Sequence, residues 1–262
     1  MTDANDDMDA LSHSVCSLFG AASTAISDGV LIQRANRQDK EFHFQNWFKL
    51  LLESQSLDFD EPGRNTYPDF RLVHNPVGYE IKGLGFPGRV ADYDCNSQIP
   101  HGVYRGRHIM YVFGRYPAKP DTNEYSVFDL VLCHGSFLNA DDEYVHKNKS
   151  IRGMGSYGDI LLRDRKMYVA PTPYGLLDGV ERQVTLVLPD SWSPSDDVVK
   201  KGEIVRLEAE RVMCGYQFDL TTNELQATWR DNPHAGRQHK FVAYRSTSSP
   251  GPDVQLKQDV QT

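Results

Sequence analysis

The spacing of the apolar residues changes along this chain from a helical period to a strand period. Residues 11–35 and about 39–54 carry apolar side chains at every third or fourth position, as in Leu11, Val15 and Leu18. This spacing places the apolar residues on one face of a helix, so we predict an amphipathic helix in each segment. A turn-rich stretch follows, and the helical spacing does not return with the same regularity.

Most of the rest of the chain consists of short apolar runs separated by turn residues, a pattern typical of strands. Residues 85–106 are polar and glycine-rich, and we expect a long loop there. The segment 204–213 is also compatible with a helix, because glutamates at 203, 208 and 210 favour helical backbone. Helices first and strands afterwards predict an α+β fold with a β-rich C-terminal half. The predicted strands cover 68–74, 79–84, 107–116, 125–133, 159–169, 183–188, 204–218 and 225–229.

The length and composition fit one domain. A chain of 262 residues can form a single hydrophobic core, and no linker-like segment divides it. We therefore predict one domain over residues 11–245. The acidic residues 1–10 and the Ser-, Pro- and Gln-rich residues 246–262 are expected to be disordered tails.

Several classes of protein are disfavoured by composition. No stretch is long and apolar enough to cross a membrane, and the acidic start does not resemble a signal peptide. The four cysteines form no CxxC pair, which favours a reducing cytoplasm over a disulfide framework or a zinc site. There is no Walker A sequence, so we expect no nucleotide cofactor. The GxGxxG match at 153–158 lacks the strand–turn–helix context of a dinucleotide site.

The net charge of −8 hides two regions of local positive charge. Residues 82–119 and residues 146–167 each carry six Lys or Arg against two Asp, or +4. Local positive surface on an acidic protein can still bind a polyanion. Mixed charge on an ordinary solvated surface is the alternative explanation.

The residues that point most directly to chemistry lie in 67–84. Turn residues at 75–78 separate two predicted strands, so a hairpin is expected there. Because strand side chains alternate, Glu80 and Lys82 share one face, and the hairpin can bring Asp69 beside them. Two close carboxylates repel unless a cation joins them, and their oxygens suit Mg²⁺. A lysine in such a cluster can position or deprotonate a water molecule.

This pattern carries a family resemblance. Pro68-Asp69 followed by Glu80-Ile81-Lys82 resembles the motif of the PD-(D/E)XK nuclease superfamily, which includes most type II restriction endonucleases. The resemblance covers about 18 residues, and the turn between its two arms agrees with it. It implies a restriction-endonuclease-like core, in which a mixed β-sheet is flanked by the N-terminal helices.

The same resemblance assigns roles to residues. It implies that Asp69 and Glu80 bind Mg²⁺ and that Lys82 orients the attacking water. Family members often add an acid from the N-terminal helix, and Glu41 occupies that position. Alternatively, Asp69 is a turn acid, Glu80 and Lys82 form a solvated pair, and Glu41 is a helix-start carboxylate favoured by the helix dipole.

In this family the loops after the lysine strand contact DNA, and the chain is rich there in side chains that bind bases or phosphates. A second candidate group is Arg163 and Arg165, which alternate on a predicted strand. A polar loop that satisfies its own backbone, and a solvated strand face, are the respective alternatives. The loop candidates for DNA binding are Arg89, Asn96, Ser97, Gln98, His101, Arg105 and Arg107.

Together these features predict a Mg²⁺-dependent, sequence-specific endonuclease that cleaves double-stranded DNA and leaves 5′-phosphate ends, a type II restriction enzyme acting as a homodimer. A nicking, repair or junction endonuclease on the same fold is one alternative. A noncatalytic DNA-binding protein with a degenerate motif is another. A β-rich ligand-binding protein has only the aromatic content in its favour.

Overall fold

The computed structural model describes residues 4–35, 42–61, 63, 66–96, 98–140, 157, 161–164, 167–219, 221–222, 224–248, 252 and 254–256. At residues 4–7, 96, 161–164, 167, 214–218 and 225 it describes the backbone only.

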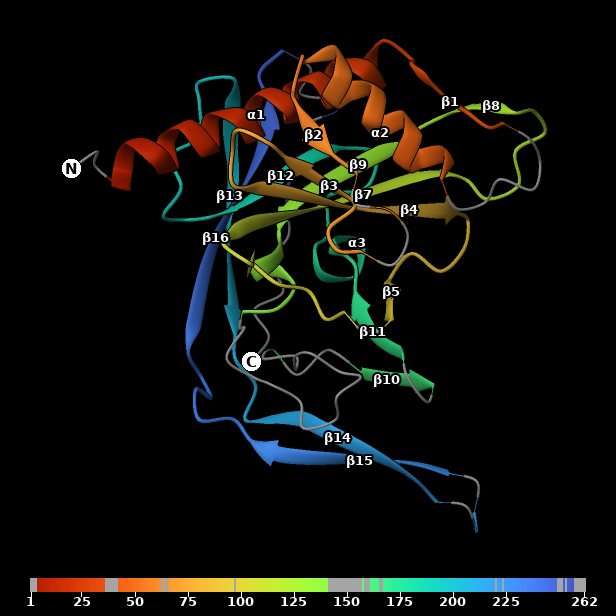
Figure 1. Cartoon of the computed structure of the whole chain (residues 1–262), viewed down its shortest axis with the longest axis vertical. Helices are drawn as coiled ribbons and strands as arrows, with labels where there is room; N and C mark the ends of the chain where they lie inside the picture. The colour runs from red at the N-terminus through yellow and green to blue at the C-terminus, as the bar shows by residue number, and fades with distance from the viewer. Residues whose placement is uncertain are drawn as a thin grey trace.

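A mixed sheet forms the centre of the described part of the chain (Figure 1). Its strands run in the order β13-β16-β12-β9-β7-β4-β3-β2, and β6 pairs with the end of β7. The pairs β4–β7 and β9–β12 are parallel, and the other pairs are antiparallel. The strands are β2 (Phe59–Asp60), β3 (Phe70–Leu72), β4 (Val77–Phe86), β6 (Val103–Tyr104), β7 (Arg107–Pro117), β9 (Asp129–His134), β12 (Val184–Pro189), β13 (Val198–Leu207) and β16 (Gln238–Ser246).

Two helices cover one face of this sheet, and a smaller sheet covers part of the other. Helices α1 (Ala4–Ser27) and α2 (His43–Ser54) lie together above the sheet in Figure 1. The opposite face packs against the small sheet and two short helices, as the composition of the second core shows. These elements are β5 (Asp92–Asn96), β10 (Leu161–Asp164), β11 (Met167–Pro171), η1 (Gly135–Phe137) and α3 (Pro173–Leu176).

Two further pairs of strands lie outside the main sheet. Strand β1 (Leu31–Gln33) pairs with β8 (Glu124–Ser126), and β14 (Arg211–Asp219) pairs with β15 (Glu224–Asp231). The β14–β15 ribbon projects away from the body at the bottom of Figure 1. Every described side chain of β15 is exposed, so both faces of this strand meet solvent.

Alternation along β4 separates the core from the candidate chemistry. Tyr79 and Ile81 belong to the core beneath the helices, whereas Leu84 belongs to the core on the opposite face. Because side chains alternate in a strand, Glu80 and Lys82 share the face of Leu84. The sheet therefore buries its helix side with apolar groups and presents a carboxylate and an ammonium on the other side.

Helix α2 rests on the sheet at a pair of glycines. Gly83 of β4 and Gly114 of β7 are register partners. A Cβ at Gly114 would lie 2.1 Å from Cζ of Phe44, and one at Gly83 would lie 3.1 Å from Cβ of Phe44. The absence of side chains at both positions thus lets the fully buried Phe44 ring reach the strand that carries Lys82.

A buried ion pair joins β7 to β9. Arg115 is 3% exposed and Asp129 is fully buried. Asp129 also accepts hydrogen bonds from the Tyr174 hydroxyl at 2.8 Å and from the backbone N–H of Arg182 at 2.6 Å. The Arg115 guanidinium packs between the rings of Phe86 and Tyr174. With its partners in place the pair is satisfied, and removal of either charge would leave the other buried alone.

The α+β class, the mixed sheet and the β-rich C-terminal half are confirmed, but several element bounds differ from expectation. Helix α1 begins at Ala4, so residues 4–10 are helical rather than part of a disordered tail. Acidic side chains near a helix start are favoured by its dipole, which suits this acidic segment. The expected loop at 85–106 contains β5 and β6, where the alternation around Tyr93 and Cys95 is that of a strand.

The predicted strand at 204–218 is two strands, and the helix alternative there is wrong. The chain turns at Glu208, which is 3% exposed and is bound by His239 at 2.8 Å and by Asn232 at 3.2 Å. These contacts fix the base of the β14–β15 ribbon, where the chain leaves β13 and returns to β16. Strand β16 had no counterpart among the predicted strands.

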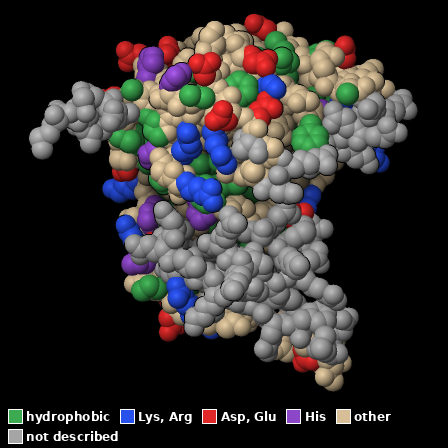
Figure 2. Space-filling model, in the orientation of Figure 1, with side chains coloured by type: hydrophobic (Ala, Val, Ile, Leu, Met, Phe, Trp, Pro, Cys, Tyr) green, Lys and Arg blue, Asp and Glu red, His purple; other side chains and the backbone are tan. Residues whose placement is uncertain are grey.

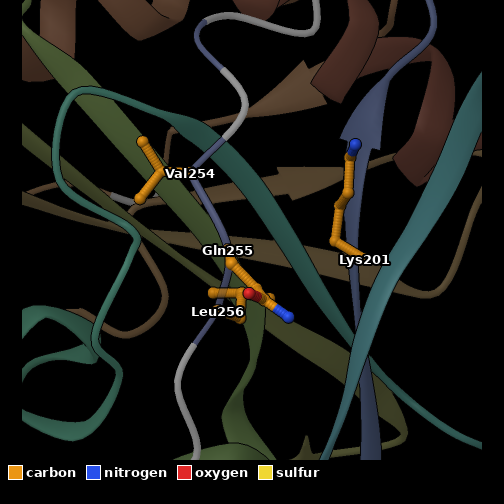
Figure 3. A pocket seen from close by; sticks show the side chains of 4 residues that line it. All are labelled: Lys201, Val254, Gln255 and Leu256. Atoms are coloured by element: carbon orange, nitrogen blue, oxygen red, sulfur yellow. The ribbon is translucent and has the colours of Figure 1, made fainter.

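Part of the expected C-terminal tail packs on the body. Leu256 contacts the core on the face away from the helices. Residues Val254, Gln255 and Leu256 line, with Lys201 of β13, a cavity of about 330 Å³ (Figure 3). No acid, histidine or cysteine lines this cavity, and none of its residues belongs to the candidate site below.

No helix in the described ranges is both long and apolar enough to span a membrane.

We expect Gly114→Ala to destabilise the protein by about 1–3 kcal/mol, because the added methyl group overlaps the Phe44 ring. Chemical denaturation followed by circular dichroism measures this. Gly20→Ala in α1 is the matched control: nothing lies within 4 Å of its Cβ position. That change should be neutral or stabilising by up to about 1 kcal/mol. Equal effects of the two substitutions would contradict the proposed packing of Phe44.

Candidate active site

The turn that leads into β3 positions the carboxylate of Asp69. Pro68 packs so closely on Gly78 that a Cβ there would lie 2.4 Å from Cγ of Pro68. Phe70 is the register partner of Tyr79, so Asp69 stands beside Glu80 just before β3 begins. Its Oδ2 accepts a hydrogen bond from the backbone N–H of Ile81 at 2.8 Å. The carboxylate thus serves as the acceptor for a β4 amide at a position where β3 has not yet begun.

The second carboxylate and the lysine interact directly. Lys82 Nζ donates a hydrogen bond to Oε1 of Glu80 at 2.7 Å. Both side chains are largely buried, with 12% of Glu80 and 25% of Lys82 exposed. The other oxygen of Glu80, Oε2, is buried and has no hydrogen-bond partner among the described residues. A buried carboxylate oxygen without a donor is costly, and a cation at that position would relieve the cost.

The three charged groups interact electrostatically. Burial, followed by repulsion from Glu80, raises the pKa of Asp69 from 3.8 to about 7, although Lys82 and the Ile81 amide oppose this. Burial alone would lower the pKa of Lys82, but attraction to Glu80 and Asp69 outweighs it and the pKa is raised. Lys82 is therefore an ammonium at neutral pH, and Asp69 titrates near neutrality.

Aromatic side chains surround the charged groups. The hydroxyls of Tyr67 and Tyr111 are hydrogen-bonded at 2.9 Å, and Lys82 Nζ lies 5.8 Å from the centre of the Tyr93 ring. Burial, followed by repulsion from Glu80, raises the pKa of Tyr67. This lining lowers the local dielectric, so the interactions among Asp69, Glu80 and Lys82 are stronger than they would be in water.

The pair Asp69–Glu80 fits Mg²⁺. Mg²⁺ is commonly held by one or two carboxylates together with water and substrate phosphate, so two acids are sufficient. The partnerless Oε2 of Glu80 supplies an available ligand. Within the part of the chain that the structure describes, no three or more His, Cys, Asp or Glu side chains gather in a metal-binding cluster. Glu41, the predicted additional acid, lies outside the described residues.

The structure places the loop candidates for DNA binding in different surroundings. Arg89 is paired with Asp92 and with Asp94, the latter at 3.1 Å. Arg107 donates to the backbone carbonyls of Leu72 at 2.7 Å and Asn75 at 3.1 Å, and so holds the β3–β4 turn. These two arginines are engaged within the protein.

The remaining loop candidates divide by exposure. His101 is buried and stacks on Tyr104. Gln98 is half-buried and donates to the Ile99 carbonyl at 3.4 Å. Arg105 is exposed at the β6–β7 turn, where its φ of 51° is left-handed. Of these three residues, Arg105 is thus the one whose side chain is exposed. DNA contact by any of them stays a prediction.

The other candidates cannot be placed as side chains. Asn96 lies in β5 and Arg163 in β10, where only the backbone is described, and Ser97 and Arg165 lie outside the described residues.

Sequence reasoning missed two residues that the fold brings to the site. Arg71 follows Asp69 by two positions and shares its strand face, a relation the strand period alone could have revealed. Tyr93 lies in the segment expected to be a loop, so its position over Lys82 was not foreseeable without β5.

Comparisons with protein-family models, curated proteins and solved structures found no match to this chain.

The raised pKa of Asp69 predicts how stability depends on pH. A carboxyl whose folded-state pKa exceeds its unfolded value stabilises the fold below the unfolded pKa, and this contribution is lost as pH rises through the folded pKa. The contribution of Asp69 to the stability of the metal-free protein should therefore be lost between about pH 4 and pH 7. Denaturant midpoints across this range should fall less for Asp69→Asn than for wild type. The exposed Asp121→Asn should follow wild type. Identical slopes for Asp69→Asn and wild type would contradict a raised pKa for Asp69.

The same pKa predicts competition between protons and metal. If Asp69 must ionise to bind Mg²⁺, apparent Mg²⁺ affinity should rise about tenfold per pH unit below pH 7 and level off above it. Titration calorimetry at several pH values measures this, and proton release should accompany binding near pH 6. A pH-independent affinity would mean that Asp69 is not a ligand.

Proposed function

We propose that this protein is a Mg²⁺-dependent endonuclease that hydrolyses phosphodiester bonds of double-stranded DNA at specific sequences, in the manner of a type II restriction enzyme. The observation that carries the proposal is the meeting of Asp69, Glu80 and Lys82 on one strand face. Glu80 and Lys82 are hydrogen-bonded there, and Glu80 raises the pKa of Asp69 whereas Lys82 lowers it. The mixed sheet with helices on one face is compatible with a restriction-endonuclease-like core.

The arrangement suits attack of water on a phosphodiester. Asp69 and Glu80 would hold Mg²⁺, which would neutralise phosphate charge and lower the pKa of bound water. Lys82 is an ammonium and can donate a hydrogen bond to the attacking water oxygen, so it acts by positioning. As the new P–O bond forms, the bond from phosphorus to the 3′-oxygen breaks. The products are a 5′-phosphate and a 3′-hydroxyl.

Surface charge supports a polyanionic substrate. Lys and Arg side chains gather near the middle of the face seen in Figure 2, below the helices. Arg105 is exposed next to Tyr104, which packs on Tyr67 directly before the Pro68-Asp69 pair. Cationic side chains beside two carboxylates can hold the phosphates that flank the bond to be broken.

Cleavage of both strands needs an active site for each. We propose a homodimer with two-fold symmetry, because a palindromic site presents the same chemistry twice. The same active site in a monomer would nick one strand, as a repair or junction endonuclease does. A noncatalytic DNA-binding protein would keep the fold and ignore Mg²⁺.

The test is incubation of the purified protein with phage DNA of known sequence, free of base modification, in Mg²⁺ or in EDTA. Discrete fragments that require Mg²⁺ are expected, with 5′-phosphate at each end. Relaxed plasmid circles without linear product would favour the nicking alternative. Intact DNA that is nevertheless bound, across several phage and plasmid substrates, would contradict catalysis and favour the noncatalytic alternative.

We expect Asp69→Asn and Lys82→Ala each to lower the cleavage rate at least about hundredfold while DNA binding in Ca²⁺ is retained. Initial rates on a mapped substrate measure this. Asp121→Asn and Lys240→Ala remove charges of the same kind from exposed positions and serve as controls. Wild-type rates for Asp69→Asn or Lys82→Ala would remove these residues from the active site.

A further inference from the structure

Arg71 lies on the sheet face that carries Glu80, and it forms no ion pair with a carboxylate in the described ranges, although Asp60 of β2 is its register partner. Phe70 and Leu72 point into the core beneath the helices, so alternation places Arg71 on the face of Asp69. Its register partner in β4 is Gly78, two residues before Glu80 on the same face. Arg71 is thus attached to the same backbone frame that positions both candidate metal ligands.

The guanidinium of Arg71 makes one hydrogen bond among the described residues. Its NH2 group donates to the carbonyl oxygen of Tyr67 at 3.0 Å, and no carboxylate in the described ranges forms an ion pair with it. Arg89 and Arg115, by contrast, are each paired with two acids. A partly exposed guanidinium with several uncommitted donors can bind an anionic ligand.

Arg105 approaches the same aromatic residues from another element. Its guanidinium lies 5.3 Å from the centre of the Tyr104 ring, and the Tyr104 ring lies 5.0 Å from the Tyr67 ring, edge to face. Arg71 holds the carbonyl of Tyr67. Arg71 and Arg105 therefore both lie next to the pair Tyr67–Tyr104, which precedes and follows the candidate site in the chain. Neither arginine forms an ion pair with an acid in the described ranges.

We propose that Arg71 and Arg105 bind the phosphodiester backbone of the substrate strand at phosphates adjacent to the one that is cleaved. The proposal rests on the proposed nuclease function. The planar guanidinium offers two parallel N–H donors that match the two free oxygens of a phosphodiester. Because one nitrogen of Arg71 is hydrogen-bonded to the Tyr67 carbonyl, the guanidinium is held in place before DNA binds.

The experiment measures DNA affinity in Ca²⁺, without cleavage, over a range of salt concentrations. Each lost phosphate contact lowers the slope of log affinity against log salt by about 1, for specific and nonspecific duplexes alike. We expect this for Arg71→Ala and for Arg105→Ala, with an affinity loss of about tenfold at low salt. Lys240→Ala, which removes an exposed charge from β16, should keep the wild-type slope. Thermal melts check folding.

Two further comparisons make the assignment specific. Arg71→Lys keeps the charge but not the fork, so it should restore the salt slope and only part of the affinity. This variant also tests the phosphate contact of Arg71 if Arg71→Ala does not fold. A neutral methylphosphonate placed at one phosphate at a time should weaken wild-type binding at the contacted position, and that effect should vanish in Arg71→Ala.

The possible failures are distinguishable. If wild type binds DNA with the same salt slope as Arg71→Ala and Arg105→Ala, the phosphate assignment is wrong, and Mg²⁺-dependent cleavage can still stand. If wild type binds no duplex even at low salt, both the assignment and the proposed function are wrong. If the variants lose affinity without any change of slope, the arginines act on the fold or on bases and not on phosphate.

Discussion

The structure holds two carboxyl groups together at the point where β3 begins beside β4. Asp69 accepts a hydrogen bond from the Ile81 amide, Glu80 binds Lys82, and tyrosine rings line the site. Two acids in a low-dielectric site cannot both ionise freely, which is why burial and Glu80 raise the pKa of Asp69 to about 7. A divalent cation would relieve this repulsion, so the constraint that disfavours ionisation of both acids agrees with the proposal that they bind Mg²⁺.

The rest of the fold supports that constraint from the other side of the sheet. Phe44 reaches the backbone of β4 through the Gly83–Gly114 pair, and the parallel pairing with β7 fixes the register of the strand that carries Glu80 and Lys82. The helix layer thus supports the strand that carries the candidate site without contributing a described side chain to that site. Core residues and the residues of the candidate active site alternate along one strand.

The sequence was sufficient where local patterns decide structure. The turn at 75–78 and the strand alternation predicted that Asp69, Glu80 and Lys82 meet, and the helical spacing predicted α2. It failed where distant contacts decide: Tyr93 became part of a strand only through pairing of β5 with β11, and Glu208 marks a bend only because His239 and Asn232 bind it. Arg107, predicted to be a DNA ligand, also holds the β3–β4 turn, and its contact with DNA stays a prediction.

The central claim is that Asp69 and Glu80 form one divalent-metal site, and direct observation of the metal tests it. Mn²⁺ can replace Mg²⁺ at oxygen ligands and scatters X-rays anomalously, so crystals soaked in Mn²⁺ locate it without reference to activity. We predict one anomalous peak between the Asp69 and Glu80 carboxylates, absent in Asp69→Asn crystals. Ordered carboxylates with no peak between them, or a peak bound only by other residues, would contradict the claim.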